Sequence, residues 1–211
     1  MKDIVVITGG GSGMGLEAAK LMDKDSHIIL VGRTPAKLQN ALDALAALGL
    51  DAEAFPADAG DAVSVEKLAA YAASLGNVKT VIHAAGISPH MASGEEIFRV
   101  NAIGTINIDT AFLKVMGPGS CILNVASMSA YMLPAAQTPT ALYQAAMKDA
   151  NAFMAGAAQM LGVRIHRLGI NGQSASSPIL LAEADRDAAV ERELEHHRHD
   201  TGDHRERDEL A

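Results

Sequence analysis

Residues 4–15 read Ile-Val-Val-Ile-Thr-Gly-Gly-Gly-Ser-Gly-Met-Gly, a short β-branched run followed by a glycine-rich loop. The next segment, residues 16–22, has apolar residues at helical spacing. Glycines between a strand and a helix let the backbone turn tightly and approach a pyrophosphate, and the helix N-terminus adds N–H donors and a positive dipole end. The candidate binding residues of this loop are Thr8, Gly9, Gly11, Ser12, Gly13, Met14 and Gly15.

Strand-like and helix-like segments alternate along the rest of the chain. We expect strands at residues 4–8, 27–31, 52–55, 80–83, 121–126 and 163–168. We expect helices at residues 16–22, 36–48, 63–75, 95–116 and 141–161. Continuous apolar strands separated by helices indicate a parallel sheet covered on both faces. Right-handed crossovers then give an α/β fold with a single doubly wound parallel sheet, Rossmann-like, with helices on both faces.

The composition bounds the class of protein. The 211 residues are 49% apolar but only 3% aromatic, so Ala, Leu, Ile, Val and Met must build the core. A formal net charge of −8 argues against nucleic acid as the main partner. Cys121 is the single cysteine, which fits a reducing compartment. The sequence offers neither a signal-peptide core nor a membrane-spanning run, so we expect a cytoplasmic protein with no membrane partner.

The acidic excess is concentrated at the C-terminal end. Residues 183–211 hold 11 acidic residues and 5 Arg, a net charge of −6, whereas residues 1–182 carry a net charge of −2. We therefore expect a Rossmann domain over residues 1–182 and a charged tail, helical or disordered, over residues 183–211. The tail is rich in histidine but has no H-E-x-x-H pattern, and we expect no functional metal site.

The loop spacing T-G-x-x-x-G-x-G resembles that of the short-chain dehydrogenase/reductase family. His83-Ala84-Ala85-Gly86 resembles the family's N-N-A-G segment, which implies that Ala84, Ala85 and Gly86 contact the dinucleotide. Asp58 falls where the family has an acidic residue near the adenine. Two further matches are to catalytic positions: Asn101 lies in an N-x-x-G pattern, and Ser127 follows the fifth expected strand.

The residues at the end of the second expected strand indicate which dinucleotide is preferred. An acidic residue there would accept hydrogen bonds from the ribose 2′-OH of NAD and repel a 2′-phosphate. This chain has Gly32-Arg33-Thr34 instead, with Lys37 one turn further on. Because a guanidinium pairs bidentately with phosphate, Arg33 favours NADP as the cofactor, with NAD as the second choice.

The resemblance implies hydride transfer between the nicotinamide and a carbonyl or alcohol carbon. Ser127 would orient the substrate oxygen, Asn101 would hold a proton-relay water, and a Tyr with a nearby Lys would exchange the proton. The candidate pair is Tyr143 and Lys148, which are five residues apart instead of the family's four. On an α-helix that spacing rotates the two side chains about 140° apart rather than about 40°.

Two interpretations of this spacing are open. A π-bulge could absorb the extra residue and restore the alignment of Tyr143 and Lys148, or both could be ordinary surface residues. Alternatively, residues 132–154 resemble an insertion that some members carry before the Tyr helix. The Tyr-x-x-x-Lys pair would then fall near residues 173–177, which contain neither residue type.

The sequence therefore predicts an NAD(P)-dependent oxidoreductase acting on a small-molecule carbonyl or alcohol. The alternative is a catalytically impaired dinucleotide-binding protein, a sensor or scaffold, that lacks a proper Tyr-x-x-x-Lys pair. The resemblance implies a homodimer or homotetramer formed through the helices expected at residues 95–116 and 141–161. No Pro-Gly turn follows residues 163–168 and no seventh strand is recognisable, so the C-terminal part is atypical or truncated relative to the family.

Overall fold

The computed structural model describes residues 2–88, 90–127 and 138–160. The chain divides after Ala157, and the fold described below is that of the first unit, Met1–Ala157. The expected strand at residues 163–168, the expected tail at residues 183–211 and the atypical C-terminal part lie outside the described residues.

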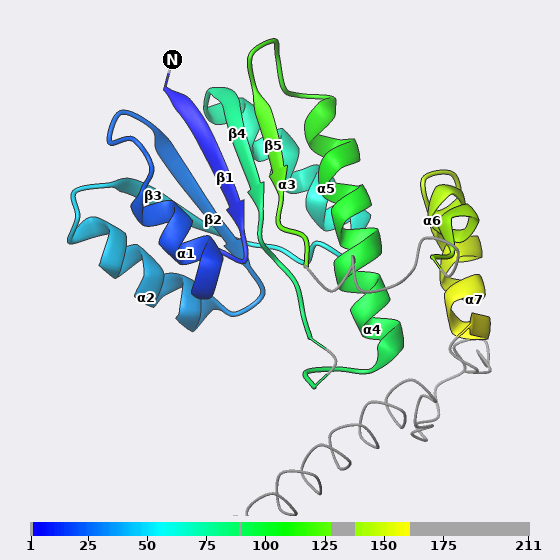
Figure 1. Ribbon diagram of the computed structural model, residues 1–211. Coiled ribbons are helices and arrows are strands. Elements are labelled where there is room, and N and C mark those ends of the chain that lie inside the picture. The colour runs from blue at the N-terminus through cyan, green and yellow to red at the C-terminus, as the bar shows by residue number, and fades with distance from the viewer. Residues whose placement is uncertain (1, 89, 128–137, 161–211) are drawn as a thin grey trace, which may run out of the picture. The chain divides into compact units, whose positions relative to one another are not determined.

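The described residues form one five-stranded parallel sheet with the order β3-β2-β1-β4-β5 (Figure 1). The strands are β1 (Asp3–Thr8), β2 (His27–Gly32), β3 (Asp51–Pro56), β4 (Asn77–His83) and β5 (Cys121–Asn124). β1 lies in the centre, paired with β2 on one edge and β4 on the other. This arrangement confirms the predicted doubly wound parallel sheet, and β5 ends two residues earlier than expected.

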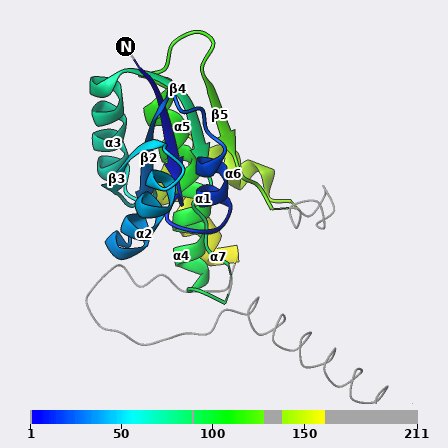
Figure 2. The ribbon, with the colours of Figure 1, turned by 90° about the vertical axis from the view of Figure 1, so that its left-hand side faces the viewer.

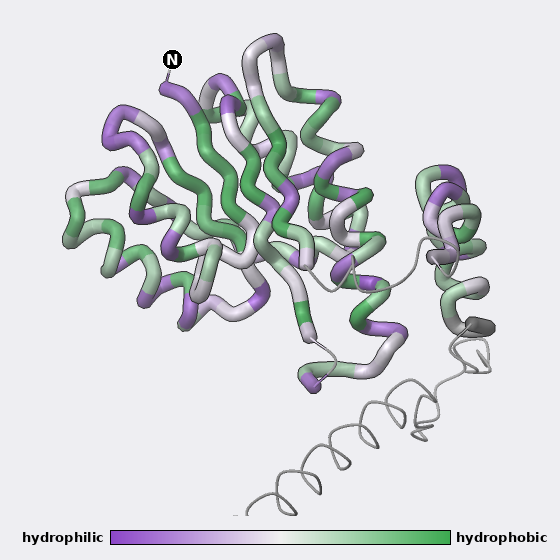
Figure 3. The backbone as a smooth tube through the Cα atoms, viewed as in Figure 1, coloured by the Kyte–Doolittle hydropathy of each residue, from purple (hydrophilic) through white to green (hydrophobic). Residues whose placement is uncertain are grey.

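Alternate residues of β1 pack into two separate cores, one on each face of the sheet. Ile4 and Val6 belong to a cluster formed with α3 (Ala62–Leu75) and α5 (Gly104–Leu113). Val5 and Ile7 belong to a second cluster formed with α1 (Gly13–Lys20) and α2 (Pro35–Ala46). Since successive side chains of a strand point to opposite faces, an unbroken apolar strand requires a helical layer on both sides. Figure 2 shows α3 and α1 on opposite sides of the sheet, and Figure 3 shows the apolar centres of the strands between them.

The single helix expected at residues 95–116 is three consecutive elements. α4 (Gly94–Phe98) is followed by η1, a π-helical segment over Arg99–Ile103, and then by α5. The Ser93 hydroxyl caps the start of α4 by accepting from the Glu96 N–H at 3.3 Å. A π turn holds one extra residue within a helix, and such turns are frequent at functional sites.

The single helix expected at residues 141–161 is likewise wrong, because the structure has two helices there. α6 (Thr140–Ala146) ends before a turn, and α7 (Ala150–Met160) begins after Asp149. The Asp149 carboxylate accepts from the N–H groups of Asn151 and Ala152 at 2.9 and 3.0 Å. An aspartate that satisfies the free N–H groups of a helix start is an N-cap, so Asp149 begins a new helix rather than continuing the old one.

Within unit 1, α6 and α7 pack on the η1–α5 segment through a third apolar cluster. Ile103, Ala146 and Phe153 are buried there. The Phe153 ring lies edge-on to Phe98, with 5.7 Å between ring centroids. In the part of the chain that the structure describes, no helix is both long and apolar enough to cross a membrane.

The neighbours Phe112 and Leu113 give a direct test of this packing. Phe112 is fully buried between α5 and the sheet, whereas Leu113 is 69% exposed. Phe112→Ala should lower the free energy of unfolding by about 3–5 kcal/mol because it leaves a cavity in the core. Leu113→Ala should change it by less than about 0.5 kcal/mol. Urea unfolding followed by circular dichroism measures both changes. Equal losses would contradict the assignment of Phe112 to the buried face of α5 and of Leu113 to its exposed face.

Candidate functional site

A cavity of about 340 Å³ opens at the carboxyl ends of the strands, where the chain crosses from β1 and β2 to β4. In an open α/β sheet, this change of direction is the place where ligands bind. The glycine loop, the end of β2 and the segments after β3 and β4 all contribute to it. The predicted cofactor residues that line the cavity are Thr8, Gly9, Ser12, Gly13, Met14, Arg33, Asp58, Ala84, Ala85 and Gly86.

The glycine loop is packed so closely that a Cβ at Gly9, Gly10 or Gly15 would lie within 3.0 Å of backbone atoms. Gly9 has a φ of 68°, and a Cβ there would lie 2.8 Å from the Ala84 carbonyl oxygen. A Cβ on Gly15 would lie 2.5 Å from the Gly9 carbonyl oxygen. The first residues of α1 therefore approach the end of β1 at backbone contact distance. Gly11 and Gly15 support this turn without lining the cavity, and Gly11 faces Lys37.

A buried hydrogen-bond chain ties the end of β1 to the end of β4. The Thr8 hydroxyl accepts from the Ala85 N–H at 3.1 Å and lies 2.7 Å from His83 Nδ1. Burial lowers the pKa of His83 and outweighs the nearby Asp109 carboxylate, so the imidazole is neutral at neutral pH. The Thr8 hydroxyl can then donate to His83 Nδ1, which fixes the segment containing Ala85 beside the glycine loop.

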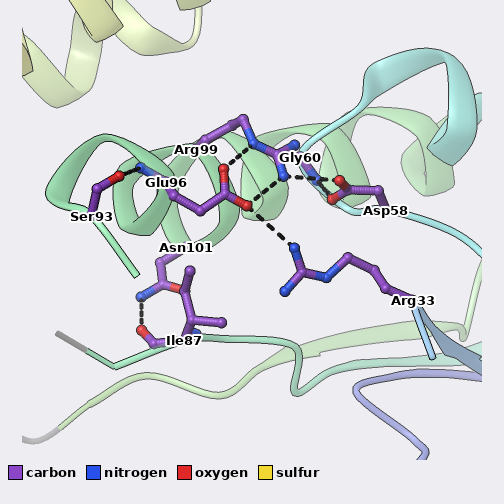
Figure 4. Close-up of polar contacts among 8 residues, drawn as sticks. All are labelled: Arg33, Asp58, Gly60, Ile87, Ser93, Glu96, Arg99 and Asn101. Atoms are coloured by element: carbon purple, nitrogen blue, oxygen red, sulfur yellow. Dashed lines mark hydrogen bonds and ion pairs between the residues drawn. The ribbon is translucent and has the colours of Figure 1, made fainter. Parts of the chain in front are cut away.

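Asn101 connects the π segment to the chain after β4. Its carboxamide oxygen accepts from the Ile87 N–H at 2.9 Å, and its NH₂ donates to the Ile87 carbonyl at 2.9 Å. Ile87 lines the cavity directly after Gly86. The two-way bond therefore holds the predicted catalytic Asn101 against Ile87, although Asn101 itself does not line the cavity (Figure 4).

A network of four charged side chains includes Arg33 and Asp58, two residues that line the cavity (Figure 4). Arg99 donates to Glu96 Oε2 through Nε and to Oε1 through Nη2, both at 2.7 Å. Arg99 Nη2 also contacts Asp58 Oδ2 at 2.8 Å. Arg33 Nη1 reaches Glu96 Oε1 at 3.2 Å. Two predicted cofactor residues, Arg33 and Asp58, are thus joined through two residues of the α4–η1 segment.

The network holds its two carboxylates in the charged form. Partial burial alone would raise the pKa of Asp58, but hydrogen bonds from Arg99 and the Gly60 N–H outweigh it and lower the pKa. The Arg99 guanidinium also lowers the pKa of Glu96. Gly60 leaves the space that Arg99 uses, since a Cβ at this position would overlap the guanidinium. Both carboxylates therefore stay ionised well into the acidic range.

Sequence reasoning missed Glu96 and Arg99, and the structure shows why. Neither residue belongs to a motif, and both lie on the helical segment after β4, far along the chain from the Arg33 and Asp58 side chains that they contact. Their spacing of three residues is a signal for a helical ion pair, which the sequence does contain. Their link to Asp58 and Arg33 depends on tertiary contacts that no local pattern encodes.

The other predicted catalytic residues are not gathered at this cavity. Ser127 lies three residues after β5 and is exposed. Tyr143 lies on α6 with 42% of its surface exposed, and its ring centroid is 5.5 Å from that of Phe153. Lys148 lies in the turn between α6 and α7, where it lines a different cavity of about 230 Å³ with Glu66 and Asn107.

The π-bulge that would align Tyr143 with Lys148 is not present in α6. The helix ends at Ala146, so the two residues do not share one helix. Within residues 2–88, 90–127 and 138–160, no group of three or more His, Cys, Asp or Glu side chains is arranged to hold a metal ion.

A glycine-rich turn at the switch point of a doubly wound parallel sheet defines a protein of the Rossmann-like class. The family model described as short chain dehydrogenase matches residues 3–172, well over half of the chain. The chain therefore belongs to the short-chain dehydrogenase family.

Individual relatives match over part of their length. The chain is 33% identical over 122 residues to the 2,3-dihydro-2,3-dihydroxybenzoate dehydrogenase of Bacillus subtilis, covering 54% of this chain and 47% of that protein. It is 30% identical over 152 residues to the L-rhamnose 1-dehydrogenase (NAD(P)(+)) of Azotobacter vinelandii, covering 64% and 59%. The chain thus spans about half the length of the curated relatives it matches.

The solved structures support the same fold. A short-chain type dehydrogenase/reductase from Mycobacterium ulcerans superposes with a TM-score of 0.57 at 24% identity. The match covers 76% of this chain and 62% of that chain.

The clamp between Asn101 and Ile87 can be tested by amide hydrogen exchange. In Asn101→Ala the Ile87 N–H loses its acceptor, so its exchange should become markedly faster, with a loss of about 1 kcal/mol of stability. Asn101→Asp is the comparison variant: a carboxylate oxygen still accepts from the Ile87 N–H, but the donor to the Ile87 carbonyl is lost, so the exchange should rise less than in Asn101→Ala. Unchanged exchange at Ile87 in Asn101→Ala would contradict the clamp.

Proposed function

We propose that the chain binds NAD(P) in the cavity at the switch point and acts as an oxidoreductase between the nicotinamide and a small carbonyl or alcohol. The observation that carries this proposal is the glycine loop, which leaves no space for a Cβ at Gly9 or Gly15. Such close packing brings the start of α1 and its N–H donors to the edge of a cavity that Arg33 also lines.

Each part of the dinucleotide has matching residues along the cavity. The glycine loop and the N-terminus of α1 suit the pyrophosphate, and Asp58 suits the adenine side. Arg33 and Lys37, which both line the cavity, suit a ribose 2′-phosphate. Ala84, Ala85 and Gly86 present backbone and small side chains towards the nicotinamide end. We therefore propose NADP as the preferred cofactor and NAD as a second one. The name of the Azotobacter vinelandii relative, L-rhamnose 1-dehydrogenase (NAD(P)(+)), likewise includes both cofactors.

The bound nicotinamide would supply or accept the hydride, and the chain's residues would handle the substrate and the proton. We assign Ser127 to orient the substrate oxygen and Asn101 to hold a proton-relay water. Tyr143 is the candidate acid/base, and Lys148 is its candidate partner. We further propose a cytoplasmic homodimer or homotetramer with no nucleic-acid partner, supported by the family resemblance and the acidic net charge.

A second candidate function is dinucleotide binding without turnover, as a sensor or scaffold. The position of Lys148 favours it, because this residue lines a cavity that shares no residue with the one beside the glycine loop. Without an ammonium nearby, the pKa of a tyrosine hydroxyl is not lowered and proton transfer is slow.

Arg33→Met tests cofactor preference. Removing a charged hydrogen bond to the 2′-phosphate should weaken NADPH binding by at least about tenfold and leave NADH binding within about twofold. The change in nicotinamide fluorescence on binding measures both affinities. Lys67→Met, which removes an exposed charge on α3, is the control and should alter neither. Equal losses for NADPH and NADH would reject the assignment of Arg33 to the 2′-phosphate.

Tyr143→Phe separates the two candidate functions. If Tyr143 is the acid/base, NADPH oxidation over a panel of ketones and aldehydes should fall by about 10²–10⁴-fold while NADPH binding is retained. Tyr71→Phe, a change on α3 against Phe55, should leave the rate unchanged. A wild-type chain that binds NADPH and turns over none of the panel supports the sensor. Turnover that survives in Tyr143→Phe rejects Tyr143 as the catalyst.

A further inference from the structure

Arg33 is engaged by a carboxylate from outside the nucleotide-binding loops. Its Nη1 lies 3.2 Å from Glu96 Oε1, and Glu96 belongs to α4, 63 residues further along the chain (Figure 4). The same guanidinium lines the cavity and is the group that a 2′-phosphate would need. A phosphate and the Glu96 carboxylate are both anions, so they compete for one cation.

Glu96 binds its two arginine partners unequally. Arg99 holds the carboxylate with two hydrogen bonds of 2.7 Å, one to each oxygen, whereas Arg33 reaches it with a single longer contact. Bidentate charge-assisted bonds of this length are the stronger kind. An incoming anion would therefore displace Glu96 from Arg33 and leave the Glu96–Arg99 pair intact, so no carboxylate would be left without a cation.

The charges of the network also cancel. Arg33 and Arg99 contribute two positive charges, and Glu96 and Asp58 contribute two negative ones. The lowered pKa values of Glu96 and Asp58 keep both carboxylates ionised at neutral pH. The network that Arg33 joins is thus electrically neutral, and Lys37, which also lines the cavity, adds a positive charge outside the network.

We propose that Glu96 sets cofactor selectivity by competing with the 2′-phosphate for Arg33. This inference rests on the proposed dinucleotide site. A cofactor without the 2′-phosphate leaves the Arg33–Glu96 pair closed, whereas a cofactor that carries the phosphate must open it. The competition lowers the ratio of NADP affinity to NAD affinity, and it gives a physical reason why the proposed site would accept both cofactors. Glu96 is a positioning residue here, because it acts on the ligand through Arg33.

Glu96→Gln tests the proposal with two nucleotide fragments that differ at the 2′ position. The variant keeps an oxygen acceptor for Arg99 but removes the charge that competes with phosphate. Adenosine 2′,5′-bisphosphate should bind about two- to fivefold more tightly, which is the worth of one exposed ion pair, and 5′-AMP should be unaffected. NADPH and NADH should show the same difference. Isothermal titration calorimetry measures all four affinities.

Glu95→Gln is the matched control. It removes the same charge one residue away, on an exposed side chain that does not face Arg33 or Arg99 in the described contacts. If its effect equals that of Glu96→Gln, the gain comes from net charge alone and the proposal fails. If Glu96→Gln folds poorly, Glu96→Asp takes its place. It keeps a charge for Arg99 but has a side chain too short to reach Arg33, so it should shift the ratio of bisphosphate affinity to 5′-AMP affinity in the same direction.

The decisive comparison repeats Glu96→Gln in an Arg33→Met background, where the effect should vanish. A gain that persists without Arg33, or equal changes for the bisphosphate and 5′-AMP, overturns the proposal and leaves the dinucleotide site standing. A folded wild-type chain that binds neither NADPH, NADH nor either fragment rejects the dinucleotide site and this inference together. Thermal unfolding of every variant shows that the comparison is between folded proteins.

Discussion

β1 is hydrogen-bonded to a strand on each edge and packed against helices on each face. Burying one strand on all sides leaves its carboxyl end as the place where the chain can present backbone to a ligand, and the order β3-β2-β1-β4-β5 puts the change of direction at that point. The glycine loop follows from this constraint. α1 must start within backbone contact of β1 to cover the sheet, and side chains at Gly9 and Gly15 would prevent that approach. The same packing that completes the hydrophobic core therefore builds the turn that we propose binds the pyrophosphate.

Electrostatic balance at the cavity is local and differs from the balance of the whole chain. The net charge of −8 comes mainly from residues 183–211, whereas the ion-pair network beside the cavity combines Arg33 and Arg99 with Glu96 and Asp58 in equal numbers. The overall acidity therefore says little about how the chain treats a phosphate. The affinity for a phosphate depends instead on which carboxylate each guanidinium contacts. Because Arg99 bonds Glu96 and Asp58 more closely than Arg33 bonds Glu96, Arg33 is the guanidinium of this network that a ligand would more easily free.

The first five strands were predictable because short runs rich in apolar residues are flanked by segments with helical spacing, and their observed bounds differ by a few residues at most. The helices of the later half were less predictable. A repeat of apolar residues does not distinguish an α turn from a π turn, so the segment Arg99–Ile103 was invisible in the sequence. The break before α7 was encoded in Asp149, an N-cap residue that lies between two segments with apolar residues at helical spacing. The contacts of Glu96 and Arg99 join segments that only the folded sheet brings together, and no local signal carries that information.

The residues proposed for nucleotide binding and for catalysis lie on different elements. The residues proposed to hold the dinucleotide lie at the end of β1, on the turns that follow the first four strands and on the first turns of α1 and α2. All of them except Gly11 and Gly15 line one cavity. Ser127, Tyr143 and Lys148 lie after β5, and Lys148 lines another cavity. Asn101 is a predicted catalytic residue that contacts the cavity lining, since its carboxamide bonds Ile87, and it lies on the π segment that begins at Arg99. A change in the helices after β5 can therefore disturb the candidate residues for proton transfer while the packing around β1 keeps the proposed dinucleotide cavity intact. The fold thus assigns the proposed cofactor binding and the proposed turnover to separate elements.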